Sequence, residues 1–244
     1  ISSSARLQSV HLWWVSGSGS YQPWRDATHV KVAVLSSGGK DSSAAIWWAQ
    51  CKGWEVTQLV TMIVEGKDSW MFQIPGTKLV KFQAELCGCE WLPVKTQGEA
   101  EKEVDDLKFA LSELDIDGIV SGALRSDYQK TRLERMAEEL NIKSFTPLWH
   151  QSSESHMSNL VANGFKVMIT GVSTEGLGGE WLGCVLNEES LQKLTLNATK
   201  YRFNIDGEGG EYETLVIAGP HMFGELKLDF EKHWDGVRGH LSFN

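Results

Sequence analysis

Apolar residues recur along this chain with two different spacings. A short β-branched run from Val30 to Leu35 is followed by a glycine turn and then by a helix-forming stretch that stops at Gly53. The same reasoning predicts strands over 56–64, 91–95 and 116–121, and helices over 78–86 and 99–114. A further helix has apolar residues at i, i+3, i+4 and i+7, namely Leu133, Met136, Ala137 and Leu140.

This alternation predicts an α/β fold, in which helices cover both faces of a parallel sheet in a Rossmann-like arrangement. Such sheets bind ligands beyond the carboxyl ends of their strands, where the strand order switches. We assign this nucleotide-binding domain to residues 30–146. After Pro147 the pattern changes to a strand over 165–172, glycine-rich loops, a helix over 189–198 and two β-forming runs. Residues 147–244 are interpreted as a second, smaller α/β region that binds the substrate.

Composition narrows the possible partners. The 244 residues are 41% hydrophobic and 23% charged, and no apolar run approaches the length of a membrane span. A net charge of −9 without a basic run disfavours nucleic acid. Four cysteines without zinc spacing fit free thiols in a reducing compartment, so we expect a cytoplasmic protein. Residues 1–29 mix Ser and Gly with Trp and show no period, and we interpret them as a leader or tag-like extension.

A glycine-rich loop joins the first predicted strand to the first helix, and this context favours an anion site. Backbone N–H groups and the positive end of the helix dipole converge there, and paired glycines allow close approach to phosphate. Hydroxyls and the Lys40 cation add to the attraction, while Asp41 would hold magnesium or cap the helix. The plainer alternative is a glycine turn with a capping Asp or Ser.

The loop sequence, 37–42, reads Ser-Gly-Gly-Lys-Asp-Ser and fits neither a Walker A loop nor a dinucleotide fingerprint. It resembles the pyrophosphate loop (PP-loop) of the N-type ATP pyrophosphatases, which implies a HUP-type domain that cleaves ATP between its α and β phosphates. The expected ATP-binding residues are Ser36, Ser37, Gly38, Gly39, Lys40, Asp41, Ser42 and Gly122.

Two later motifs add candidate residues. A helix after the strand ending near Gly122 places Tyr128, Gln129 and Arg132 close together, although an exposed amphipathic helix explains the spacing equally well. Arg132 would neutralise the α-phosphate or a substrate carboxylate. Residues 207–214, Gly-Glu-Gly-Gly-Glu-Tyr-Glu-Thr, carry three carboxylates that would repel one another without a cation among them, unless the turn is simply solvated.

The order of these motifs, with Pro-Leu-Trp at 147–149 between them, resembles the diphthine–ammonia ligase family over about residues 31–230. The resemblance implies ATP and Mg²⁺ as cofactors, and elongation factor 2 carrying diphthine as substrate. The substrate carboxylate would be adenylated and then attacked by ammonia from ammonium, giving diphthamide, AMP and pyrophosphate. We expect Lys40, Asp41 and Arg132 to be catalytic, with Asp41 on the metal.

The implied substrate-binding residues are Tyr128, Gln129, Trp149, Glu208, Gly209, Gly210, Glu211 and Glu213. Because a trimethylammonium group cannot donate hydrogen bonds, we expect Glu208 and Glu211 to face it, with an aromatic wall from Trp149 or Trp181. His150 and Gln151 depart from the residues expected after Pro-Leu-Trp, which puts any role for that loop in doubt.

Two other readings stay open. One is a different ATP pyrophosphatase that modifies tRNA, although thiolation needs a cysteine pair near the nucleotide and the acidic charge disfavours tRNA. The other is a non-catalytic adenine-nucleotide-binding module, because a fold alone never establishes activity. The sequence also leaves open the source of ammonia and whether the chain forms a homodimer.

Overall fold

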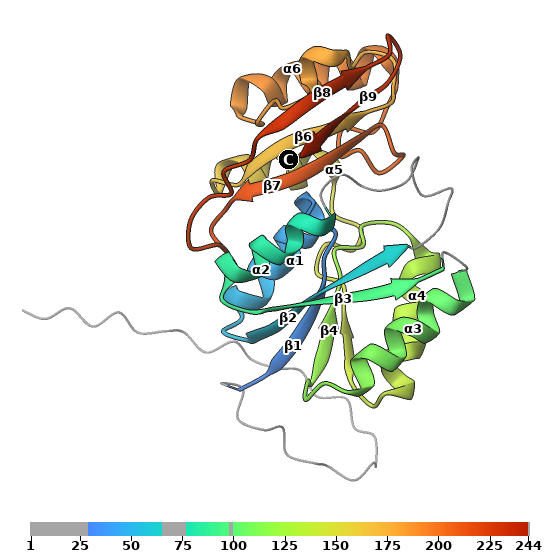
Figure 1. The fold of residues 1–244 in the computed structure, drawn as a ribbon. Helices are drawn as coiled ribbons and strands as arrows, with labels where there is room; N and C mark the ends of the chain where they lie inside the picture. The colour runs from blue at the N-terminus through green and yellow to red at the C-terminus, as the bar shows by residue number, and fades with distance from the viewer. Residues whose placement is uncertain (1–28, 65–76, 98–99, 244) are drawn as a thin grey trace, which may run out of the picture.

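The computed structural model describes residues 29–64, 77–97 and 100–243. These residues form two β-sheets with helices packed on and between them (Figure 1). The interpretation of residues 1–29 as a leader falls almost wholly on residues 1–28, which lie outside the described residues. None of the helices in the described ranges is both long and apolar enough to cross a membrane.

The first sheet has five parallel strands in the order β3-β2-β1-β4-β5. This order confirms the predicted Rossmann-like α/β class, and it places the switch in strand order between β1 and β4. The elements are β1 (Lys31–Leu35), α1 (Lys40–Cys51), β2 (Glu55–Val64), a 3-10 turn η2 (Thr77–Leu79), α2 (Val80–Cys87), β3 (Glu90–Thr96), α3 (Ala100–Ser112), β4 (Gly118–Val120), α4 (Asp127–Glu139) and β5 (Lys143–Phe145).

Side-chain alternation along β1 divides the core into two layers. Val32 and Val34 point to the face covered by α1 and α2, whereas Ala33 points to the face covered by α3 and α4. Successive residues of a strand point to opposite faces, so all three are fully buried. The strand therefore reads as a continuous apolar run.

The second sheet is antiparallel, in the order β7-β6-β9-β8. The predicted second, smaller region of strands and helices is confirmed, and its helices pack on an antiparallel sheet. Sequence reasoning missed the short strand β5 and the helix α5. The elements are α5 (Ser153–Ala162), β6 (Lys166–Val172), a 3-10 turn η3 (Gly179–Trp181), α6 (Glu188–Tyr201), β7 (Tyr212–Ala218), β8 (Phe230–Trp234) and β9 (Gly239–Phe243).

The two sheets share one hydrophobic core. Helices α1 and α2 lie between them, with the first sheet on one side and strand β7 on the other (Figure 1). Buried residues of α1, such as Ile46 and Ala49, belong to the same cluster as Ile169 and Leu215 of the second sheet. Because apolar contact is not directional, this core joins the two halves but does not by itself determine the positions of their polar loops.

Candidate functional site

The loop between β1 and α1 has the geometry of an anion-binding turn. Gly38 has φ of +85°, a conformation that favours glycine, and its N–H donates to the Ser36 hydroxyl at 3.2 Å. Gly39 caps the helix without a side-chain hydrogen bond, which leaves amides of the first turn to other partners. The Ser36 and Ser42 hydroxyls lie 3.3 Å apart on the inner side of the turn.

Strand β7 of the second sheet supports this loop from behind. The Val216 N–H donates to the Gly38 carbonyl at 2.9 Å, and the Lys40 N–H donates to the Thr214 hydroxyl at 3.2 Å. A Cβ atom on Gly39 would lie 3.3 Å from the Thr214 carbonyl oxygen. Gly38 and Gly39 thus meet the second sheet, and the described cavity lining includes neither of them. Thr214 belongs to the acidic motif, so the first and third sequence motifs are in direct contact.

Asp41 is held from two sides. The Lys40 ammonium lies 2.7 Å from its Oδ2, and Nε2 of His156 lies 2.7 Å from its Oδ1. Burial alone would raise the pKa of the Asp41 carboxyl, but the charges and hydrogen bonds of Lys40 and His156 lower it below its ordinary value. The Lys40 side chain is 6% exposed and engaged by Asp41, and its role toward phosphate stays a prediction.

A cavity of about 470 Å³ opens beside the loop, at the switch in strand order, and its size suits a small-molecule site. Four residues of the phosphate loop line it, together with the turn after β4, one side of α4 and the acidic loop. Apolar side chains form its inner wall. The polar and glycine residues of the lining are Ser36, Ser37, Asp41, Ser42, Thr61, Thr77, Glu103, Ser121, Gly122, Tyr128, Gln129, Arg132 and Glu208.

The second motif reaches the cavity as expected. Gly122 passes so close to the start of α1 that a Cβ atom there would lie 2.6 Å from the Asp41 carbonyl carbon, so only glycine fits. Tyr128, Gln129 and Arg132 on α4 all line the cavity. The Arg132 guanidinium lies 3.4 Å from the centre of the Tyr128 ring, a cation–π contact that holds the cation at the rim.

The three glutamates of the third motif are separated by the structure. Glu208 lines the cavity, and partial desolvation together with the charge of Asp41 raises the pKa of its carboxyl. Glu211 turns back into its own loop, where its oxygens accept hydrogen bonds from Asn204 N–H at 2.8 Å and from Gly209 N–H at 2.7 Å. Glu213 is exposed on β7 opposite Gly171. The expectation that Glu208 and Glu211 face one cation needs correction, since Glu211 shapes the loop.

The expected aromatic wall is not formed by either tryptophan. Trp181 is 7% exposed within the core of the second sheet. Trp149 packs against His150 with tilted rings whose centres are 4.8 Å apart, and Lys130 lies over its ring. Neither tryptophan is among the described residues that line the cavity, whereas Tyr128 is.

Comparison with known proteins decides the family. Models of the N-terminal and C-terminal domains of diphthamide synthase match residues 30–144 and 152–244. The chain belongs to the diphthamide synthase family. A diphthine–ammonia ligase from Mus musculus is 31% identical to it, covering 82% of this chain and 83% of the mouse protein.

The share of each relative that this diphthamide synthase family member covers varies. A diphthine–ammonia ligase from Schizosaccharomyces pombe is 32% identical over 78% of this chain, which spans 35% of the yeast protein. The Homo sapiens diphthine–ammonia ligase is 28% identical over 82% of this chain and 83% of its own. Among solved structures, a predicted subunit of tRNA methyltransferase from Methanocaldococcus jannaschii has a TM-score of 0.44 and 18% identity, covering 78% of this chain and 98% of that one.

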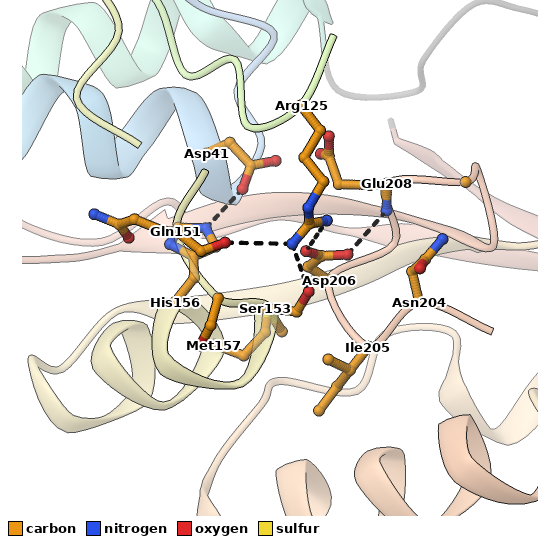
Figure 2. Close-up of polar contacts among 12 residues, drawn as sticks. Asp41, Arg125, Gln151, Ser153, His156, Met157, Asn204, Ile205, Asp206 and Glu208 are labelled. Carbon is orange, nitrogen blue, oxygen red and sulfur yellow. Dashed lines mark hydrogen bonds and ion pairs between the residues drawn. The ribbon is translucent and has the colours of Figure 1, made fainter. Parts of the chain in front are cut away.

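Three polar residues beside the candidate site of this diphthamide synthase family member were missed by sequence reasoning. His156 on α5, Arg125 after β4 and Asp206 before the acidic loop all lie near Asp41 and Glu208 (Figure 2). The sequence offered a signal only for the start of α5, where Ser152 is a residue type that often caps helices. In the structure its hydroxyl accepts from the Ser155 N–H. Nothing in the sequence marked the Arg125–Asp206 pair.

The carboxylates present are compatible with magnesium that arrives with ATP. No group of three or more metal-binding side chains occurs among the residues that the structure describes. Magnesium typically uses one or two carboxylates plus substrate phosphates and water. Asp41, Glu103 and Glu208 are the described carboxylates that line the cavity, and one or two of them would suffice for this role.

Proposed function

We propose that this chain catalyses the ATP-dependent amidation of diphthine on elongation factor 2, the activity named for its relatives, at the cavity beside the phosphate loop. The observation that carries the proposal is that this cavity is lined by both Asp41 of the phosphate loop and Glu208 of the acidic loop. A nucleotide and a cationic substrate would therefore meet in one cavity. Residues 30–146 would bind ATP, and residues 147–244 would contribute to substrate binding.

ATP would lie with its phosphates against the Ser36–Ser42 turn. The helix amides and serine hydroxyls would hold the departing pyrophosphate, because donors fixed in advance stabilise developing charge. Ser121 supports occupancy by a ligand, since its buried hydroxyl lines the cavity and has no hydrogen-bond partner in the part of the chain that the structure describes. Magnesium held by Asp41, with Glu208 nearby, would neutralise phosphate charge.

The substrate carboxylate would attack the α-phosphorus, forming an acyl-adenylate and releasing pyrophosphate. Arg132 at the rim would bind the carboxylate or the α-phosphate during this step. The nitrogen of ammonia would then attack the acyl carbon, so that the amide forms, AMP leaves and a proton departs from nitrogen. Gln129 lies on the same wall and would help to orient the acyl group.

Glu208 would bind the trimethylammonium group. A quaternary ammonium offers charge without hydrogen donors, so carboxylates and aromatic faces recognise it. Glu208 would supply the charge, and Tyr128 is the aromatic residue among the described residues that line the same cavity. Glu211, Gly209 and Gly210 would act through the shape of the loop.

Release of AMP and pyrophosphate tests this proposal directly. The protein would be incubated with ATP, magnesium and ammonium, with and without elongation factor 2 that carries diphthine. We expect release only with the modified factor, together with a mass change on the factor that corresponds to conversion of a carboxylate to an amide. Tight ATP binding with no release would support an adenine-nucleotide-binding module and contradict the proposal.

A further inference from the structure

A cluster of polar contacts lies where the two halves of the molecule meet. Arg125, in the turn between β4 and α4, extends its guanidinium toward the second sheet (Figure 2). Its Nη1 donates to Oδ2 of Asp206 at 2.8 Å, and its Nη2 donates to the Ser153 hydroxyl at 2.7 Å and to the Gln151 carbonyl at 3.3 Å. The planar fork of arginine makes all three contacts at once, which a lysine could not do.

The partner of Arg125 is fully buried. The Asp206 side chain is 0% exposed, whereas that of Arg125 is 39% exposed. Burial alone would raise the pKa of the Asp206 carboxyl, but hydrogen bonds from Ser153 and Arg125 and the charge of Arg125 lower it, so the group is ionised. A buried carboxylate without its cation is strongly unfavourable, so the pair holds Arg125 and Asp206 at fixed positions.

The second oxygen of Asp206 faces the acidic loop. Its Oδ1 accepts from the Glu208 N–H at 3.4 Å, so one carboxylate connects Arg125 to the backbone of Glu208 (Figure 2). The loop around Glu208 contains two glycines in the left-handed region, Gly207 and Gly210, with φ of +72° and +80°. Neither Arg125 nor Asp206 is among the described residues that line the cavity, whereas Glu208 is.

We infer that Arg125 is a positioning residue, which acts through Asp206 to hold Glu208 at the wall of the nucleotide cavity. This inference rests on the proposed function, in which Glu208 binds the cationic substrate. The pair is not needed to join the two halves, because the shared apolar core already does so. Its particular contribution is the placement of one carboxylate relative to ATP.

Steady-state kinetics of the full chain test the inference, with elongation factor 2 carrying diphthine as the varied substrate. In Arg125→Leu we expect the KM for this substrate to rise about tenfold or more, since displacement of a binding group by about 1 Å costs up to 100-fold. The dissociation constant for ATP, measured separately, should change less than about twofold. Asp206→Asn should raise the same KM, and the double variant should be no worse than the worse single variant, because the residues act as a unit.

Matched variants separate positioning from general damage. Lys166→Leu removes an ion pair of 2.6 Å with Glu225 at the end of β6 away from the acidic loop, and it should leave the KM unchanged. Arg125→Lys keeps the charge and should recover part of the wild-type KM. Where Arg125→Leu does not fold, Arg125→Lys and Asp206→Asn carry the test.

The two proposals fail in different ways. Wild-type protein that releases no pyrophosphate with modified elongation factor 2 would contradict the proposed function. A different outcome would overturn the inference: the Arg125 and Asp206 variants fold, keep the activity and the KM of the wild type, and differ only in a lower melting temperature. The pair would then be a structural contact.

Discussion

The contact between His156 and Asp41 gives the sharpest prediction about the phosphate loop. His156 is 2% exposed and reaches from α5 to the carboxylate that Lys40 holds on its other side. Replacing His156 with Leu removes a hydrogen bond to a charged group, which typically costs about 1.5–3 kcal/mol. If the orientation of Asp41 is required for pyrophosphate release, kcat/KM for ATP should fall about 10- to 100-fold. Initial rates of pyrophosphate release would measure the fall.

Stability against pH provides a second readout, measured on the nucleotide-free protein. The pKa of Asp41 is lowered in the folded state, so its stabilising effect is present above the ordinary value of 3.8 and is lost as pH falls through the folded pKa. Without His156 the folded pKa rises, so this contribution shrinks. We expect His156→Leu to lower the unfolding free energy at neutral pH and to flatten its decline in acid.

Two further variants make this prediction specific. His156→Gln keeps a donor near the position of Nε2 and should recover most of the rate. His221→Leu removes a histidine that is equally buried, at 2% exposed, but stacks on Phe165 away from Asp41, and it should leave kcat/KM unchanged. Folded His156→Leu with wild-type kcat/KM would refute the proposed role of the contact.

Other positions give shorter predictions. Burial lowers the pKa of His221 to about 4, so the stability that depends on its neutral form is present above 6.5 and lost as pH falls toward 4. Over this pH range the wild-type protein should lose about 3 kcal/mol of unfolding free energy, and His221→Phe should not show this loss. Chemical unfolding at several pH values would measure both. Gly122→Ala should weaken ATP binding at least about tenfold in a titration, because its Cβ atom would meet the Asp41 backbone. Glu211→Ala should raise the KM for the protein substrate and leave ATP binding intact, since its carboxylate holds the acidic loop.

Periodicity was sufficient for most of the first sheet, because buried parallel strands are apolar throughout and their helices carry regular apolar stripes. It failed for β5, whose three residues Lys143–Phe145 are too few to show a period. It also failed for α5, which has Met157 and Leu160 at helical spacing but buries the polar His156 beside them. The strands of the second sheet were expected, but not their antiparallel direction, because a run of β-forming residues does not indicate strand direction.

The phosphate loop was predictable because its chemistry is local, with glycines, hydroxyls and the start of a helix within seven residues. The contacts across the two halves were not. Arg125 and Asp206 are 81 residues apart, and Asp41 and His156 are 115 apart. Each of these side chains is unremarkable in its own segment, and only the packing of α5 beside both loops brings them together.

Helix α5 explains why the two halves act as one site. Ser153 and His156 are three residues apart and therefore lie on the same side of the helix, where one bonds Arg125 and the other bonds Asp41. The same helix surface thus contacts the cation that anchors the acidic loop and the carboxylate at the phosphate loop (Figure 2). A shift of α5 would move both groups together, so in the proposed complex the geometry between nucleotide and substrate would depend on a helix that does not itself line the cavity. The second half of the chain thus supplies contacts that hold the phosphate loop, from His156 to Asp41 and from Thr214 to Lys40.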